Sequence, residues 1–463
     1  MFTKFVIFVP IALFLVSCHN ESAKFKEMLG NIELEKIISL NPEMSHGTVE
    51  KNTAPIDKEI VNTPTTYKDF IEENVKFNVI LAVSKYPEIK SQAFQREMAK
   101  SGVDMAKAAK EIQITGNLLT GAKAENSQTE ASAVGNLSLG QVIYDYGSTD
   151  FAIASQKEAV RSAVLSEKIA VEKVALEAYK AWINLARSYE IERVFRRGID
   201  LATPLLGQIR NISTSGIADK TGLLAAQQKF ASLEIGYART KSATVAAKAV
   251  FDDVFQSTGS IQVEALPPIR LDVKHKASEN TFSNALDVQA NESIEMSKSL
   301  EIKALEAASN PQVYFRANAT LPAENIRDDG VATVGVDVSY LFNDGGFKKS
   351  QIEMLKFEID SIRQQKSALI LVKISTLKVL EQQYDLAIKR ISSSEELLKL
   401  AAEVRETVKA QLVSGRSSIQ DVMDAEVTFS ETEIELINAK ADAALASYEI
   451  FALTDSLSQH IEW

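Results

Sequence analysis

The residue types that most often carry enzymatic chemistry are few in this 463-residue chain, and they are scattered along it. The four histidines are far apart, the chain has a single cysteine, and no glycine-rich phosphate-binding loop occurs. The formal net charge of −11 argues against a nucleic-acid partner, because phosphate binding needs a clustered positive surface. We therefore expect no catalytic residue, no bound metal, no cofactor and no nucleic acid.

The single cysteine, Cys18, stands at a position that favours covalent modification. An apolar run from Phe5 to Val16 follows Lys4, which is the layout of a secretory signal and is too short to span a membrane. The run ends in Leu-Val-Ser-Cys, which resembles the bacterial lipobox, after which the cysteine becomes the lipidated first residue. We expect residues 1–17 to be a signal peptide and residues 18–66, which are polar, to be a lipidated tether. A buried cysteine in an ordinary signal peptide is the alternative.

The elements that position the other candidate residues occur twice in the chain. Residues 133–160 run from alternating apolar residues through a corner at Asp145 and Gly147 into a long helical pattern, and residues 332–359 repeat this through Asp344 and Gly346. The two corners are separated along the chain by the same offset as two breaks centred on Gly216 and Gly415. The equal spacing predicts an internal duplication of strands and a helical hairpin. We expect repeats at 67–257 and 281–457, a connector at 258–280 and a tail at 458–463.

Alternating polar and apolar residues predict four strands, two in each repeat. Residues 313–321 and 334–342 alternate most clearly, Leu137, Leu139 and Ile143 repeat the pattern earlier, and a weaker strand precedes them at 112–118. The polar segments 121–131 and 322–330 are predicted to be the hairpin links.

One apolar face could simply rest on a soluble core. Polar residues on the opposite face, and strands of about nine to eleven residues, instead favour a barrel with lipid outside and water inside. Four strands cannot close such a barrel, so copies from several chains must complete it, and three chains would supply twelve strands.

Two long helical patterns follow the corners, at about 148–212 and 347–412, and each predicts a rod on the order of 95 Å long. Each rod turns at its Gly break and returns, through 223–255 or 422–453, as an antiparallel hairpin. The second rod carries a heptad file of apolar residues at Ile370, Leu377, Tyr384, Ile391 and Leu398, which predicts a coiled-coil seam. A second file, at Ile374, Ile388 and Ala402, also contains Glu381 and Glu395, which weaken it.

From about Tyr67 to Leu457 the chain resembles the TolC-like outer-membrane channels of efflux pumps and type I secretion systems. The resemblance is carried by SLGQVIYDYG at 138–147, its copy YLFNDGG at 340–346, and GRSSIQDVMDA at 415–425. It implies a mainly α protein, a homotrimer with one twelve-stranded barrel in outer-membrane lipid. A helical tunnel across the periplasm would dock an inner-membrane transporter through a periplasmic adaptor. A coiled-coil adaptor or structural lipoprotein is the alternative, although adaptors usually carry one hairpin flanked by compact β-rich domains.

In that family the last of these motifs places two aspartates at the periplasmic mouth, which here are Asp421 and Asp424. A spacing of three puts both on one helical face. Three chains would then make two rings of carboxylates, which favour cations at a narrow pore. The alternative is that both residues only stabilise the positive end of the return helix.

The residues that hold the mouth closed in the best-known members are absent, because the matching positions are Gly222, Leu412 and Ser417. A shifted salt bridge is expected instead, between Arg416 after the second break and Asp219 in the first turn. The alternative is that Arg416 is a solvated turn residue or an adaptor contact. The turns at Gly216 and Gly415 are the expected tips for adaptor docking.

Overall fold

The computed structural model describes residues 67–125, 128–214, 220–256, 261–263, 265–269, 279–322 and 331–461, all of which belong to the compact unit Pro64–Trp463. The predicted signal peptide, Cys18 and the tether lie outside the described residues. So do Gly216, Asp219 and most of the predicted connector. Among the described helices, none combines the length and the apolar character that crossing a bilayer requires.

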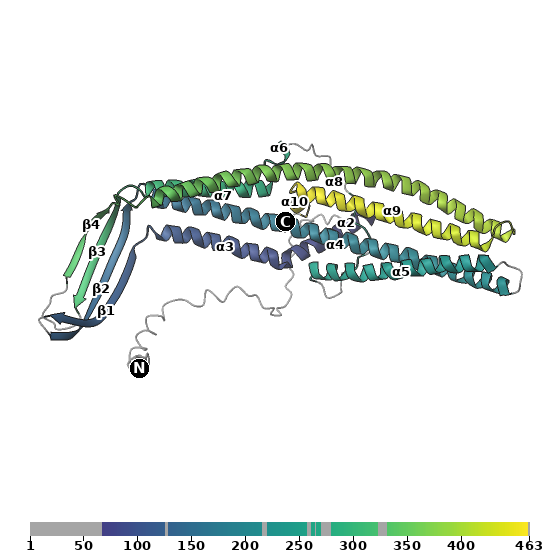
Figure 1. The fold of residues 1–463 in the computed structure, drawn as a ribbon, viewed down its shortest axis with the longest axis horizontal. Helices are drawn as coiled ribbons and strands as arrows, with labels where there is room; N and C mark the ends of the chain where they lie inside the picture. Colours follow the sequence, from purple (N-terminus) through teal and green to yellow (C-terminus); the bar gives the residue numbers. More distant parts are fainter. Residues whose placement is uncertain are drawn as a thin grey trace, which may run out of the picture. The chain divides into compact units, whose positions relative to one another are not determined.

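Long helices make up most of the described chain (Figure 1). The described helices, long and short, are α2 (Tyr67–Lys85), α3 (Pro87–Ala108), α4 (Ser148–Thr214), α5 (Lys220–Val254), α6 (Glu279–Phe282), α7 (Leu286–Ala307), α8 (Phe347–Val413), α9 (Ile419–Leu453) and α10 (Leu457–His460).

The long helices come in pairs of equal length. Both α4 and α8 have 67 residues, both α5 and α9 have 35, and both α3 and α7 have 22. The offset between the first residues is the same in all three pairs, and it equals the offset between the corners Asp145 and Asp344. Two hairpins of equal length were predicted from this spacing, and the structure confirms them.

The four strands form one antiparallel sheet in the order β1-β2-β3-β4. They are β1 (Gln113–Glu125), β2 (Gln128–Tyr144), β3 (Gln312–Pro322) and β4 (Val331–Ser339). The predicted link at 121–131 is wrong, because Gly121 pairs with Ser132 and the ladder continues to Glu125 and Gln128. Backbone pairing does not depend on side-chain polarity, so polar residues extend this hairpin. Strand β4 ends earlier than predicted, because its last partner is Gln312, the first residue of β3.

The register of the sheet separates an apolar face from a polar face. One row across the four strands contains Ile114, Leu139, Ala317 and Val334. The next row contains Thr115, Ser138, Asn318 and Thr333. Successive residues of a strand point to opposite faces, so these rows lie on opposite sides. The polar side also carries an ion pair between Arg316 Nε and Asp337 Oδ2 at 2.9 Å. The predicted alternation is confirmed, except that Ile143 lies at a bulge between Val142 and Tyr144.

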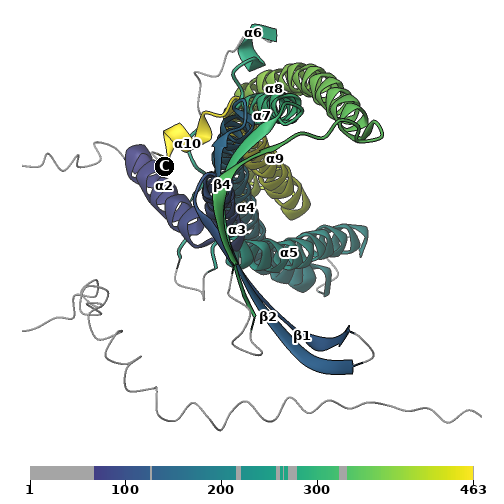
Figure 2. The ribbon, with the colours of Figure 1, turned by 90° about the vertical axis from the view of Figure 1, so that its left-hand side faces the viewer.

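Each strand is continued by one helix, so helices and strands form one layer. Helix α3 leads into β1, β2 into α4, α7 into β3, and β4 into α8. Beside the sheet the helices lie in the order α3-α4-α7-α8, and toward the hairpin tips in the order α5-α4-α9-α8. Figure 2 shows α8, α9, α4 and α5 along an arc rather than around a closed bundle. The layer therefore has a first edge, made of β1, α3 and α5, and a second edge, made of β4 and α8.

The main core lies around the middle of α4. Tyr179, stacked on Tyr448 of α9 at 4.1 Å between ring centroids, and Trp182, whose Nε1 donates to the Ala265 carbonyl at 3.1 Å, are both buried. Four fully buried alanines on α9, Ala439, Ala441, Ala443 and Ala444, let that helix approach its neighbours closely.

The coiled-coil seam of α8 is confirmed in its first file, and in its second file Ile374 and Ile388 pack against the buried cluster while the deepest burial falls one residue earlier. Leu377 and Tyr384 are buried, whereas the second buried file contains Lys373, Leu380, Ala387 and Ser394. This file lies one residue before the predicted one. The observed register places Leu380 and Ala387 in the contact and leaves Glu395 exposed, which avoids burying a carboxylate.

A buried carboxylate on α4 binds the start of the short helix α10, which follows α9. Glu172 of α4 accepts backbone N–H groups of Leu457 at 3.2 Å and Ser458 at 2.8 Å, at the start of α10. Burial raises the pKa of Glu172, and the hydrogen bonds from Ser458 and Leu457 oppose this shift only in part.

Candidate functional site

The two predicted corners have the same hydrogen bonding. Asp145 accepts the backbone N–H of Gly147 at 3.0 Å and that of Thr149 at 2.8 Å. Asp344 accepts the equivalent groups of Gly346 and Lys348, both at 2.9 Å. Gly147 (φ 82°) and Gly346 (φ 86°) adopt the left-handed conformation that glycine allows at this turn. The structure therefore places these residues where a strand ends and a long helix begins, with a structural role.

At the second tip, Gly415 and Arg416 end α8. Gly415 has φ 69°, its N–H donates to the Leu412 carbonyl at 3.0 Å, and the Arg416 N–H donates to the Gln411 carbonyl at 2.9 Å. These bonds satisfy the last carbonyls of the helix, as in a Schellman motif. The Arg416 side chain is exposed at the tip, and its predicted partner Asp219 lies outside the described residues.

Asp421 forms a capping box at the start of α9. The Ser418 hydroxyl oxygen accepts the Asp421 N–H at 3.1 Å, and the Asp421 carboxylate accepts the Ser418 N–H at 2.8 Å. Hydrogen bonds from the Ser418 backbone and hydroxyl, and from the Ser417 hydroxyl, lower the pKa of Asp421. The geometry gives Asp421 the helix-end role that was the alternative, while its exposed carboxylate remains charged at neutral pH. Ser418 three residues before Asp421 is the sequence signature of this cap.

Asp424 links the two hairpins. Its Oδ1 lies 3.3 Å from Nζ of Lys229 on α5, and Asp424 itself belongs to α9. Around this pair, Ala226 of α5 and Met423 and Val427 of α9 form one buried cluster. Sequence reasoning missed Lys229, because the pair joins helices that belong to different hairpins and no local pattern marks it.

A second group of charges near the tip joins α8 to α9. Glu426 is 3% exposed and lies 3.6 Å from Nη1 of Arg405 and 3.4 Å from Nζ of Lys409. The Arg405 guanidinium also lies 4.0 Å above the ring of Phe429. A buried carboxylate with two cations stabilises the contact only while both partners remain, because an unpaired buried charge is costly.

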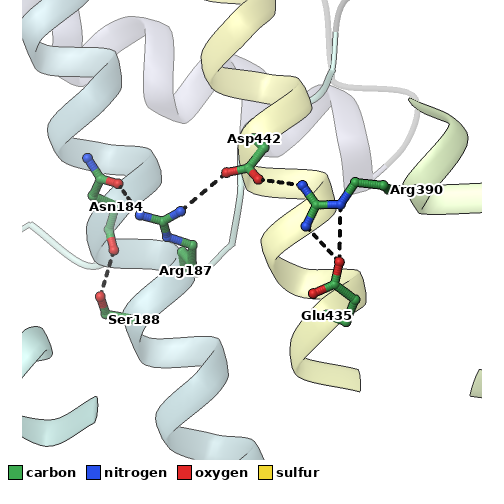
Figure 3. A network of polar contacts seen from close by, with 6 residues as sticks. All are labelled: Asn184, Arg187, Ser188, Arg390, Glu435 and Asp442. Atoms are coloured by element: carbon green, nitrogen blue, oxygen red, sulfur yellow. Dashed lines mark hydrogen bonds and ion pairs between the residues drawn. The ribbon is translucent and has the colours of Figure 1, made fainter. Parts of the chain in front are cut away.

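Further from the tip, Asp442 of α9 connects three helices (Figure 3). It lies 3.4 Å from Arg187 of α4 and 3.0 Å from Arg390 of α8, and Arg390 also donates to Glu435 at 2.6 Å. Glu435, Asp442 and Glu449 recur every seven residues, and Glu449 pairs with Lys180 of α4 at 2.5 Å. This acidic file on α9 was not predicted, although its seven-residue spacing was visible in the sequence.

The described residues hold no group of three or more His, Cys, Asp or Glu side chains arranged for a metal ion. What they provide is a set of ion pairs between helices and a two-faced sheet. The site therefore consists of contacts that position helices around a tip.

No protein-family model and no curated protein sequence matches the chain. Among solved structures, it is similar to the outer-membrane channel OprN, with a TM-score of 0.73 and 12% identity over 85% of this chain and 92% of that one. It is also similar to the CmeC outer-membrane channel of Campylobacter jejuni, with a TM-score of 0.68 and 14% identity over 91% and 97%. A third is the open state of the MtrE outer-membrane channel of Neisseria gonorrhoeae, with a TM-score of 0.66 and 14% identity over 90% and 98%. The chain thus has the fold of these channels, which confirms the predicted mainly α fold with one four-stranded antiparallel sheet.

Proposed function

We propose that this chain is one subunit of a homotrimeric exit duct that crosses the outer membrane and extends through the periplasm. The observation that carries the proposal is the curved layer of helices and strands. Its sheet has an apolar and a polar face, and the layer is open along its first edge (β1, α3 and α5) and along its second edge (β4 and α8). The duct would be a passive channel of a tripartite efflux pump or a type I secretion system. The fold shared with outer-membrane channels supports this.

The sheet supports an assembly of several chains. No described strand pairs with the outer side of β1 or of β4, so both leave backbone groups unpaired. In lipid such groups must be satisfied, which requires a closed barrel. Three copies would supply twelve strands, with Val334 and its row toward lipid and Asn318 and its row toward water. The equal helix lengths at one constant offset also fit an origin of the chain by internal duplication.

We assign the restraint of the periplasmic mouth first to the pair Lys229–Asp424. It joins the two hairpins of one chain, and both side chains are nearly half exposed. An exposed pair of this kind stabilises by about 1 kcal/mol or less. Three copies acting together would still bias a two-state mouth. A salt bridge between Arg416 and Asp219 remains our second proposed restraint at the tips, where an adaptor would dock.

The entrance is proposed to prefer cations. Asp421 is ionised at neutral pH, its hydrogen bonds at the helix start stabilise the charged form further, and Asp424 lies three residues further along the same helix. In a trimer these carboxylates would form two rings at the narrow end. The capping role of Asp421 is compatible with this, since one carboxylate can cap a helix and still face a pore.

Single-channel recording in planar bilayers tests this function and separates the two roles of Asp424. Lys229→Ala should raise conductance and keep the cation preference, because the restraint is lost while the carboxylates remain. Asp424→Asn should raise conductance and lower the preference, and Asp421→Asn should lower only the preference. Lys241→Ala, an exposed lysine on the same helix, is the matched control and should change neither. Folded protein that never forms channels would contradict the proposal.

The proposed partners and anchor have tests of their own. Affinity purification of the detergent-solubilised protein should recover a periplasmic adaptor and an inner-membrane transporter. Metabolic labelling with a fatty acid should mark the wild type and not Cys18→Ser. Mass spectrometry that finds an unmodified Cys18 in the mature chain would contradict the lipid anchor.

A further inference from the structure

The polar face of the sheet contains a hollow close to the point where the strands meet the helices. Its volume is about 330 Å³, and it is lined by residues of β1, β2 and β3 and of the link between α3 and β1. The lining side chains include one cation, Arg316, together with the hydroxyl and amide groups of Thr115, Ser138 and Asn318. The hollow is therefore a polar recess with a single positive charge.

Two contacts hold the Arg316 guanidinium in place. Its Nε lies 2.9 Å from Oδ2 of Asp337 on β4, and its Cζ lies 5.3 Å from the centre of the Tyr314 ring on the same face of β3. Among the residues that the structure describes, no other group contacts the guanidinium. The side chain is half exposed, so its two Nη groups keep their N–H donors for a ligand.

Glycine on both neighbouring strands leaves space beside Arg316. The register places Gly140 of β2 and Gly335 of β4 directly opposite it. A Cβ built at either glycine would meet no heavy atom within 4 Å. Glycine weakens the interior of a strand, and it often marks a site where a ligand approaches the backbone closely. A ligand can therefore reach the guanidinium from the polar face without displacing a neighbouring side chain.

A guanidinium that is held at Nε presents its Nη groups to an oxyanion. Arginine binds a carboxylate through two parallel hydrogen bonds, and such charge-assisted bonds are stronger than neutral ones. Thr115 and Ser138, in the next row of the same face, offer hydroxyl groups to the same ligand. The acidic lining residue Glu111 precedes β1, at the end of the hollow next to the helices. An anion is therefore expected to approach Arg316 from the opposite end of the sheet.

We propose that Arg316 is an anion-binding residue in the lumen of the barrel and that it binds the carboxylate group of a molecule in transit. In a trimer, three copies of Arg316 would lie at one level of the barrel. Their charge is opposite in sign to that of the acidic rings proposed at the tip. This inference rests on the proposed function, and it adds a substrate class, namely molecules that carry a carboxylate.

Block of single channels by citrate, a tricarboxylate, tests the inference. Citrate is added on the side of the barrel away from the helices. The double variant Arg316→Gln with Asp337→Asn removes the guanidinium and leaves the net charge unchanged. It should raise the half-blocking concentration by about tenfold or more, because a charge-assisted contact is lost. Asp337→Asn alone should keep the block, because the guanidinium remains.

Two further variants control this measurement. Arg316→Lys keeps the charge and loses the planar fork, so its half-blocking concentration should lie between those of the wild type and the double variant. The matched control is Arg363→Gln with Glu295→Gln, which removes an ion pair of 2.7 Å between α8 and α7, outside the sheet. Its half-blocking concentration should equal that of the wild type.

The outcomes separate this inference from the proposed function. Equal block of the wild type and of the double variant would show that Arg316 serves only as the cross-strand partner of Asp337. That result would overturn the inference and leave the duct intact. Equal block of the wild type by citrate and by mannitol, a neutral polyol, would also overturn it, because no anion would be recognised. Folded protein that forms no channels would contradict the proposed function itself, and the inference would fall with it.

Discussion

Gly236 of α5 is the position where the structure predicts the sharpest effect of adding one methyl group. A Cβ built there would lie 2.3, 2.6 and 3.0 Å from three ring carbons of Phe195 on α4. Carbon atoms in favourable contact are about 3.5–4.0 Å apart, so the ring or the helix must move by roughly 1.2 Å. Phe195 packs against the cluster that joins α4, α5 and α9, which limits this movement. Overpacking of this kind costs about 1–3 kcal/mol.

Gly207 of α4 is the matched control for Gly236→Ala. No heavy atom lies within 4 Å of a Cβ built at Gly207. Both substitutions replace a helical glycine by alanine, which stabilises a helix by about 1 kcal/mol. The helix term cancels in the comparison, so Gly236→Ala should be less stable than Gly207→Ala by about 1–3 kcal/mol.

Hydrogen exchange of the intact protein measures this difference locally. Amides of residues 190–200 and 230–240 should lose protection in Gly236→Ala, whereas Gly207→Ala should keep or increase the protection of its own helix. Equal gains of protection in the two variants would refute the packing argument. Such a result would show that α4 and α5 can move apart enough to accept the added methyl group beside Phe195.

Three further variants test other contacts. Asp442→Ala should lower the local stability of α9 by about 1 kcal/mol, because its ion pairs are partly exposed, and a double-mutant cycle with Arg187→Ala that shows no coupling would contradict the link to α4. Asp145→Ala should lower the local stability of the start of α4 by about 1–2 kcal/mol, because two backbone N–H groups lose their acceptor. Proteolysis at the start of α4 should therefore be faster, and an unchanged cleavage rate would contradict the role of Asp145 at the corner. Glu172 has a raised pKa, so its ionised form costs stability above that pKa and the cost disappears as the pH falls below the ordinary value of 4.5. The Tm of Glu172→Gln relative to wild type should therefore rise between pH 4 and pH 7, and a constant difference would contradict the burial of the charge.

The parts of the fold that depend on local spacing could be predicted from the sequence. The constant offset between the corners and the Gly breaks predicted equal hairpins, because a helix converts residue number directly into length. Alternation predicted the two faces of the sheet because side chains in a strand have a period of two. Asp145 and Asp344 could be located because an aspartate before glycine marks a turn that begins a helix.

The parts of the fold and of the site that depend on distant partners could not be predicted from the sequence. Polar residues 121–131 were read as a link, although the ladder between β1 and β2 runs through them. The second seam file of α8 shifted by one residue, because which of two adjacent residues faces α9 depends on the partner helix. The pair Lys229–Asp424 joins two hairpins whose relative position no local pattern specifies.

A cryo-electron microscopy map of the full-length protein in lipid nanodiscs tests the central claim most directly. The account predicts threefold symmetry, a closed barrel of twelve strands within the disc, and a continuous helical tube on one side of it. A map in which the apolar face of the sheet packs on protein, or in which β1 and β4 stay unpaired and no lumen forms, would contradict it.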